Sequence, residues 1–303
     1  MTKIIAEIGS NWLTKEDCYT SITKAKDCGV DAVKFQHYDD IDLYGFDADK
    51  DTHKNAIPEA WVADLSRFAR ELGVEFGCTF FSDKKLKNHI EALDFIKVAS
   101  SDMQHDDIIQ VAKESGKPVY ISTGGHTNKE IEQMVDQHDD KCITWLFCDS
   151  AYPSYSIPYA SIAQLERLAG RAVGISDHTK GQVTLVAAHQ FWDFPVIEKH
   201  VNLTGVMSRP DSGSFAINES DLRKLVKAAK NRRQNEILDS TFERSMRELH
   251  NRRIVATKEI AKGEELTEEN TAFARAVYPN RNYMTMIDAG TMASKDYKPG
   301  ESI

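Results

Sequence analysis

The sequence predicts an α/β protein: a (β/α)8 TIM barrel followed by a small β-rich domain. Two observations lead to this fold class. Short β-prone runs alternate with longer amphipathic runs eight times over the first roughly 230 residues, as in a barrel of parallel strands. The composition then changes near residue 240, where a charged stretch begins. An open doubly wound sheet is the alternative, and the lack of a GxGxxG motif after the first run weakens its nucleotide-binding form.

The eight predicted strands are rich in β-branched and aromatic residues and end at turn-forming or polar residues. They span residues 3–9, 32–38, 75–81, 94–100, 118–124, 143–150, 172–178 and 196–201. The segments between them have apolar residues at helical spacing, and Gly29 and Gly73 stand where two of the helices should end. The clearest predicted helices span residues 15–29, 58–73, 107–116, 159–170 and, after the eighth strand, 219–238.

The chain beyond the last predicted helix is expected to form a separate, smaller domain. We expect the barrel domain at 1–238, a linker at 239–252 and a small domain at 253–303. Two similar phrases, KEIAKGE and KDYKPGE, lie in the last of these. About 50 residues are too few for an ordinary independent enzyme, so this domain is expected to pack against a barrel.

Charge and cysteine content restrict the class of protein. The net charge is −9, which argues against general binding to nucleic acid or to a membrane surface. Met1-Thr2-Lys3 leads into an apolar run too short for a signal peptide or a membrane span. The five cysteines form no CxxC pair, so we interpret them as reduced thiols of a cytoplasmic protein.

The active site of a barrel forms at the carboxyl ends of its strands, and nearly every predicted strand ends in polar residues. Alternation along a strand puts Glu198 and His200 on one face. By the same alternation, Lys34 and Gln36 share one face of their strand, and Ser176 and His178 share one face of theirs. If these faces point inward, lysines and serines form a local anion site, and the two imidazoles suit a divalent metal.

Each of these residues has a plain structural explanation when taken alone. A single histidine at a strand end is usually hydrogen-bonded, and a single lysine usually reaches solvent. The stretch 196-VIEKHVNL-203 puts three ionisable groups into one apolar strand. Burying unpaired charge costs several kcal/mol per group, so the pattern as a whole favours an enzyme with an anion and metal site.

These residues fall in recognisable motifs. In order, AEIGSN, VKFQ, IKVAS, STGG, SDHTKG, IEKH and RPD resemble the sialic acid (N-acetylneuraminate) synthase family, the phosphoenolpyruvate-condensing nonulosonate synthases. The tail IVATKEIAKGEELTEEN is similar to the antifreeze-like (SAF) domain that follows the barrel in that family. The resemblance covers nearly the whole chain.

The resemblance implies a role for each candidate. His178 and His200 would hold a divalent metal, manganese or magnesium, and Glu7 and Glu198 would be the catalytic carboxyls. The phosphoenolpyruvate-binding residues would be Lys34, Lys97, Ser100, Ser122 and Ser176. The sugar-binding residues would be Gln36, Tyr152, Asp211 and Arg275, with Arg281 a less favoured substitute for Arg275. Arg275 would reach the barrel of a partner subunit, which implies a domain-swapped homodimer.

Departures from the family pattern lie mostly on the sugar side. Phe147 stands where the family usually has histidine, and Ser150 and Ser212 also differ. The sugar therefore stays open among N-acetylmannosamine, its 6-phosphate and the precursors of legionaminic or pseudaminic acid. The expected reaction joins phosphoenolpyruvate to such an amino-sugar and releases phosphate.

Two alternatives stay open. One is an aldolase that forms a Schiff base through Lys34 or Lys97. The other is a non-catalytic protein for glycan binding or assembly. Lys199 lies on the strand face opposite Glu198 and His200, and we expect it to pair with an acid on an outer helix.

Overall fold

The computed structural model describes residues 2–46, 52–138, 140–231, 252–278 and 284–303 of the 303. Contacts divide the chain into two compact units, Met1–Arg232 and Arg233–Ile303, which are treated separately below. The predicted boundary at 238 and almost all of the predicted linker 239–252 fall outside the described residues, as does Arg281.

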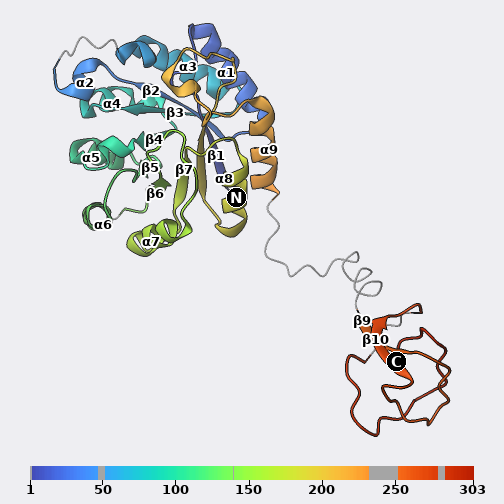
Figure 1. Ribbon diagram of the computed structural model, residues 1–303. Coiled ribbons are helices and arrows are strands. Elements are labelled where there is room, and N and C mark those ends of the chain that lie inside the picture. Colours follow the sequence, from blue (N-terminus) through green and yellow to red (C-terminus); the bar gives the residue numbers. More distant parts are fainter. Residues whose placement is uncertain (1, 47–51, 139, 232–251, 279–283) are drawn as a thin grey trace. The chain divides into compact units, whose positions relative to one another are not determined.

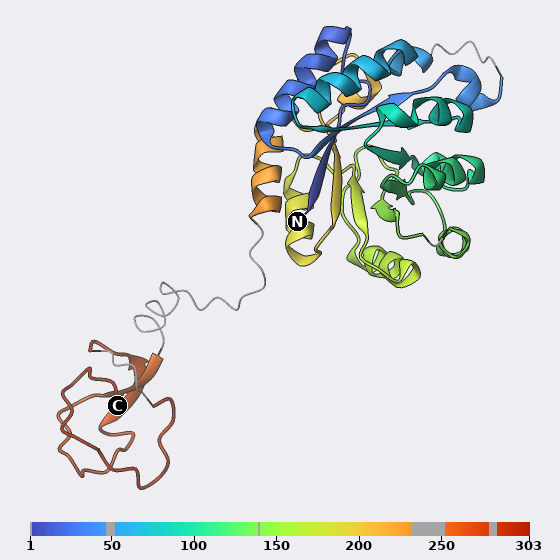
Figure 2. The same cartoon turned by 180° about the vertical axis from the view of Figure 1, so that it is seen from behind.

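Unit 1 is a closed barrel of eight parallel strands, with β1 bonded to both β2 and β8 (Figure 1, Figure 2). The strands are β1 Lys3–Glu7, β2 Ala32–His37, β3 Glu75–Phe80, β4 Phe95–Val98, β5 Val119–Ser122, β6 Ile143–Cys148, β7 Gly174–Asp177 and β8 Val196–His200. All eight predicted strands are confirmed. The closure of the sheet shows that the doubly wound alternative was wrong.

Helices surround the barrel and bury their apolar faces against it (Figure 1). They are α1 Lys15–Cys28, α2 Asp40–Tyr44, α3 Val62–Glu71, α4 Asp83–His89, α5 Asp106–Glu114, α6 Asn128–Gln137, α7 Tyr159–Ala169, α8 Val183–Phe191 and α9 Glu219–Lys230. Thr14 and Asp17 form a capping box at the start of α1, and Gly29 ends it in the left-handed region at φ 84°. The predicted helix 58–73 begins as a 3-10 turn, Glu59–Trp61, before α3.

Six buried side chains fill the amino-terminal half of the barrel interior. We call them the apolar floor: Ile5, Ala32, Phe95, Tyr120, Leu146 and Val196. Gly77 leaves room for this layer, because a methyl group there would overlap the ring of Phe95.

A polar layer lies next to the apolar floor. Each of its members follows a floor residue by two positions on the same strand: Glu7, Lys34, Lys97, Ser122, Cys148 and Glu198. Alternate side chains of a strand share a face, so the polar layer lies directly above the apolar floor.

Unit 2 contains an antiparallel pair of strands, β9 Arg252–Ala256 and β10 Thr271–Arg275. Its small core is formed by Ile254, Ala256, Ile260, Leu266, Ala293, Tyr297 and Ile303. The unit is small and partly β-structured; its antifreeze-like identity stays a prediction. Within the described ranges, the chain does not form a helix with the length and apolar character needed to cross a bilayer.

Candidate active site

A cavity of about 320 Å³ opens at the carboxyl ends of the barrel strands. It brings together most of the predicted site residues of unit 1: Glu7, Lys34, Gln36, Ser100, Ser122, Tyr152, Ser176, His178, Glu198, His200 and Asp211. Lys97 is buried and does not form part of the cavity wall. Arg275 belongs to unit 2, where it ends β10 opposite Arg252.

On one side of the polar layer, the side chains of Glu7 and Lys34 are buried in direct contact. These residues face each other in the register of β1 and β2, and Lys34 Nζ lies 2.7 Å from Glu7 Oε2. Lys34 also donates to Thr79 Oγ1 at 3.0 Å. The second oxygen of Glu7, Oε1, is buried without a hydrogen-bond partner, so it is available to a ligand in the cavity.

The other side of the polar layer is organised around Glu198. Ser176 Oγ donates to Glu198 Oε1 at 2.8 Å, and Lys97 Nζ lies 4.0 Å from the same oxygen. Lys97 also donates to the carbonyl of Val98 at 2.9 Å. Glu198 Oε2 and Ser122 Oγ are buried and unpartnered. These two atoms are therefore free to bond a substrate without breaking an existing hydrogen bond.

The two carboxyls have opposite proton affinities. Burial raises the pKa of Glu7 to about 8, and the charge of Glu198 adds to this effect, so together they outweigh the attraction of Lys34. Burial alone would also raise the pKa of Glu198, but Lys97 and Lys34 outweigh it and lower the pKa to about 2. Two carboxyls whose pKa values are driven apart suit one proton donor and one proton acceptor at neutral pH.

Aromatic rings gather at the outer end of the cavity, which we call the aromatic end: Tyr152, His178 and His200 line it, and Phe215 packs against all three. The two imidazole centroids are 5.4 Å apart. Tyr152 lies 4.0 Å from His178, and Phe215 lies 5.2 Å from His200. Tyr152 is 55% exposed whereas Ser122 is 2% exposed, so the aromatic end faces the mouth and the serine lies deep.

The two histidines fit an open metal site. His178 Nδ1 lies 2.7 Å from the carbonyl of Asp149, which can only accept, so the proton is on Nδ1 and Nε2 is free to bind a cation. Burial lowers the pKa of His178 and lowers that of His200 to about 4, which keeps both rings neutral. A cluster of three or more His, Cys, Asp or Glu ligands is not found among the described residues. Water or substrate would therefore complete the coordination shell.

Asp211 is fixed at the mouth by the loop that follows β1. Its Oδ2 accepts from the backbone N–H of Ser10 at 2.7 Å, and Asn11 Nδ2 donates to its carbonyl at 2.8 Å. Gly9 has φ 54°, and a methyl group there would overlap Asp211 Oδ2. The Gly-Ser-Asn of the first motif thus positions a carboxylate 3.9 Å from His200 Nδ1.

The prediction that Lys199 pairs with an acid on an outer helix was wrong. Lys199 is fully buried, and its Nζ lies 2.5 Å from Asp177 Oδ2, on the neighbouring strand, rather than near an acid of an outer helix. Asp177 and Lys199 are register partners of β7 and β8, and each precedes one of the two histidines. The ion pair therefore joins the two histidine-bearing strands on their outer side.

The three departures from the family pattern differ in position. Ser150 lines the cavity, whereas Phe147 is partly buried against the hydrophobic core. Ser212 Oγ donates to the carbonyl of Arg209 at 2.6 Å in a 3-10 turn, Pro210–Ser212. Only Ser150 is thus placed to touch a ligand in this cavity.

Several lining or packing residues were not among the predicted site residues, among them Phe81, Cys148 and Phe215. The sequence held a signal for Cys148, because it follows Leu146 of the apolar floor by two residues. Phe81 directly follows β3 and lines the cavity. Phe215 lies in the loop after β8, where no periodic pattern indicates which side chains turn inward.

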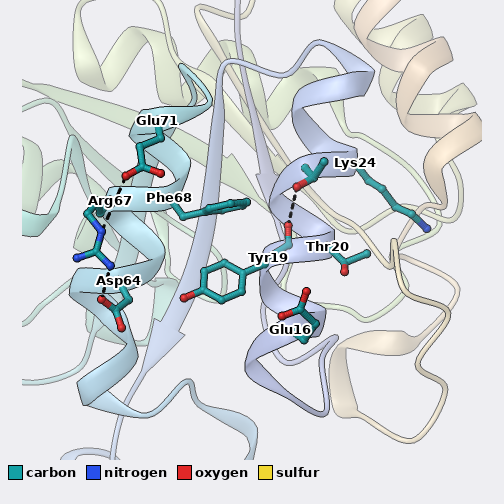
Figure 3. Close-up of a pocket in the computed structure, with 9 residues that line it drawn as sticks. Glu16, Tyr19, Thr20, Lys24, Asp64, Arg67, Phe68 and Glu71 are labelled. Atoms are coloured by element: carbon teal, nitrogen blue, oxygen red, sulfur yellow. Dashed lines mark hydrogen bonds and ion pairs between the residues drawn. The ribbon is translucent and has the colours of Figure 1, made fainter.

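A second hollow, of about 430 Å³, lies between α1 and α3 on the outside of the barrel (Figure 3). Tyr19 and Phe68 pack edge to face across it at 4.8 Å. Its cations are already bonded: Arg67 to Asp64 at 2.8 Å, and Lys24 to the carbonyl of Leu203 at 2.8 Å. These contacts are those of a helix interface, and the hollow is remote from the strand ends.

Similarity to known proteins agrees with this geometry. A model of the NeuB family matches residues 21–237. The chain belongs to the NeuB family. This NeuB-family chain is 30% identical to the pseudaminic acid synthase of Helicobacter pylori over 312 residues, covering 92% of this chain and 88% of the relative. The pseudaminic acid synthase of Campylobacter jejuni is 26% identical over 331 residues, 99% of this chain and 94% of the relative.

A solved structure with the same fold is the N-acetylneuraminic acid synthetase of Leptospira borgpetersenii. It superposes with a TM-score of 0.72 at 24% identity, over 80% of this chain and 89% of the other. The predicted family is thus confirmed, and the chain is an enzyme of the NeuB family. The roles assigned above to individual residues stay predictions.

Proposed function

We propose that this NeuB-family enzyme condenses phosphoenolpyruvate with the open-chain aldehyde of an N-acetylmannosamine-type amino-sugar. The products are a nine-carbon 2-keto acid and inorganic phosphate. The observation that supports this most strongly is the polar layer, in which two buried lysines stand with two carboxyls of opposite protonation at neutral pH. The relatives named as pseudaminic acid synthases add independent support.

The deep end of the cavity suits phosphoenolpyruvate. Lys34 lines this end and would bond the phosphate or carboxylate directly, whereas the buried Lys97 would add positive charge from outside the cavity wall. Ser122 Oγ has no competing partner, and Ser100 Oγ accepts from the N–H of Gly124 at 3.1 Å, which leaves its own proton to donate. Ser176 is engaged with Glu198, so it would bind the same ligand only by sharing its hydroxyl.

The outer end suits the sugar. A manganese or magnesium ion held by His178 and His200 would act as a Lewis acid that polarises the aldehyde. Tyr152, Gln36 and Asp211 would bind the sugar hydroxyl and amide groups. Arg275 would join them from a partner subunit, which makes the homodimer part of the proposal.

In the proposed reaction, C3 of phosphoenolpyruvate attacks the aldehyde carbon and forms the new C–C bond. Glu7, protonated at neutral pH, gives its proton to the aldehyde oxygen. Water adds to the cationic C2, and Glu198 accepts the proton of that water. The proton of the new C2 hydroxyl passes to the phosphate as the C2–O bond breaks, which leaves the keto group and inorganic phosphate. Return of the proton on Glu198 to Glu7 through solvent restores both carboxyls for the next turnover.

One observation favours the Schiff-base alternative. Burial lowers the pKa of Lys97, and a lysine with a lowered pKa is a better nucleophile. That reaction would not need a metal. Trapping of the protein by borohydride with pyruvate, or full activity in EDTA, would favour it over condensation.

The proposed function is tested by phosphate release from phosphoenolpyruvate with a panel of amino-sugars. We expect release that requires both a sugar and manganese or magnesium, and that stops in EDTA and returns when metal is added back. Release without sugar, or none with any sugar from folded, metal-loaded protein, would contradict the proposal.

A pH profile tests the role of Glu7. Because the protonated form is the proposed acid, kcat/KM should be level below pH 8 and should fall about tenfold per pH unit above it. Glu7→Gln should lower the level and remove this limb of the profile. A rate that rises with pH through 8 would instead make Glu7 a base.

A further inference from the structure

A buried polar network lies on the outer side of β7 and β8, behind the two histidines of the candidate metal site. It consists of Asp177, Thr179 and Lys199, and we call it the rear network. We propose that these three are positioning residues, which hold His178 and His200 in place for a divalent cation. The inference rests on the metal site of the proposed function and identifies residues that set its affinity without touching the ion.

The rear network is attached to the chain immediately beside each imidazole. Asp177 and Thr179 are the sequence neighbours of His178, and Lys199 directly precedes His200. Asp177 and Lys199 are register partners of β7 and β8, so each histidine follows its member of the pair by one residue. Because side chains alternate along a strand, the network lies on the outer face while the imidazoles point into the cavity.

Each member of the rear network is bonded to the other two. Lys199 Nζ lies 2.5 Å from Asp177 Oδ2 and also donates to the carbonyl of Thr179. The hydroxyl of Thr179 donates to the same oxygen of Asp177 at 2.9 Å, and the backbone N–H of Thr179 donates to Asp177 Oδ1 at 3.3 Å. The backbone on both sides of His178 is therefore tied to the lysine that precedes His200.

Burial makes the rear network rigid. Lys199 is fully buried, and Asp177 and Thr179 are 3% and 1% exposed. Water therefore does not replace a broken contact, and a polar group left unpaired there costs free energy. Well-packed apolar side chains often stabilise such a place as well as an ion pair does, or better. The geometry that the network fixes explains it better than stability alone does.

The two imidazoles differ in how far other contacts hold them. His178 Nδ1 lies 2.7 Å from the carbonyl of Asp149, and the backbone carbonyl of His178 accepts from the N–H of Ser154 at 3.0 Å. His200 Nδ1 is buried without a hydrogen-bond partner. The position of His200 therefore depends more on the backbone at the end of β8, which Lys199 anchors. Residues that orient metal ligands are typically worth roughly 10–100-fold in metal affinity.

The test is a titration of the full chain with manganese, without substrates, in which electron paramagnetic resonance measures the free ion. Thr179→Val removes one hydroxyl at nearly constant volume and should raise the Kd for manganese roughly tenfold, whereas Thr179→Ser keeps the bond and should stay within about twofold of wild type. Ser66→Ala is the matched control, because Ser66 on α3 is also buried and its hydroxyl donates to the carbonyl of Ala92 at 2.5 Å. It should leave the Kd unchanged.

A double variant, Lys199→Met with Asp177→Leu, separates positioning from stability. It leaves no buried charge unpaired and should be more stable than Lys199→Met alone, yet its Kd for manganese should be roughly 100-fold above that of wild type. Wild-type affinity in this double variant or in Thr179→Val would overturn the inference. A wild-type protein that does not bind manganese would overturn the metal site and the inference with it. Manganese binding without phosphate release from any sugar would overturn the condensation alone.

Discussion

Replacing Glu198 with glutamine should lower kcat by roughly 10²–10⁴-fold, the range for loss of a general base. Glutamine has nearly the same shape and can still accept from Ser176, which bonds Glu198 at 2.8 Å. It cannot take the proton of the attacking water. The measurement is steady-state phosphate release with saturating sugar and metal.

The same variant should separate binding from catalysis. Glu198 lies 4.0 Å from Lys97 and competes with an anionic substrate for that charge, so the KM for phosphoenolpyruvate should stay level or fall. Glu75→Gln is the control, since Glu75 is also a strand glutamate paired with a lysine, 2.6 Å from Lys3, but at the start of β3. It should leave kcat unchanged. A Glu198→Gln enzyme with nearly wild-type kcat would assign the base to another group.

Lys199→Met should destabilise unit 1 by about 3–5 kcal/mol, the cost of leaving one member of a buried ion pair alone. Lys199 is fully buried and Asp177 is 3% exposed, so water cannot replace the lost contact. Urea unfolding followed by tryptophan fluorescence measures this, because all four tryptophans lie in unit 1: Trp12, Trp61, Trp145 and Trp192.

Two further variants make the result specific. Lys87→Met on α4 removes an exposed lysine and should change the unfolding free energy by less than about 0.5 kcal/mol. The double variant Lys199→Met with Asp177→Leu should be more stable than Lys199→Met alone, because no buried charge is left unpaired. A Lys199→Met protein as stable as the Lys87→Met control would show that the ion pair does not hold β7 to β8.

The strand pattern predicted the barrel well, because strands buried on both faces read as apolar runs ended by turns. Alternation then placed Glu198 with His200 and Ser176 with His178 on inward faces, and the structure agrees. These predictions need only the phase of one strand. Alternation along a strand therefore predicted correctly that these four side chains point into the barrel.

The sequence could not predict which side chains on neighbouring strands contact each other. The Asp177–Lys199 and Glu7–Lys34 pairs depend on the register between neighbouring strands, which decides which residues lie opposite each other. The inward–outward alternation along one strand does not determine this register. The opposed pKa shifts of Glu7 and Glu198 follow from those pairings together with burial. Phe215 comes from a loop, where no period constrains direction.

The apolar floor affects the order in which substrates bind and products leave. Because side chains from six strands close the lower end of the described barrel, a molecule that reaches the polar layer is expected to enter and leave at the carboxyl ends of the strands. Ser122 lies deep whereas Tyr152 is exposed, so a sugar bound at the aromatic end would lie between the deep serine and solvent. In the proposed reaction, phosphoenolpyruvate should therefore bind first, and the phosphate made from it should be released last.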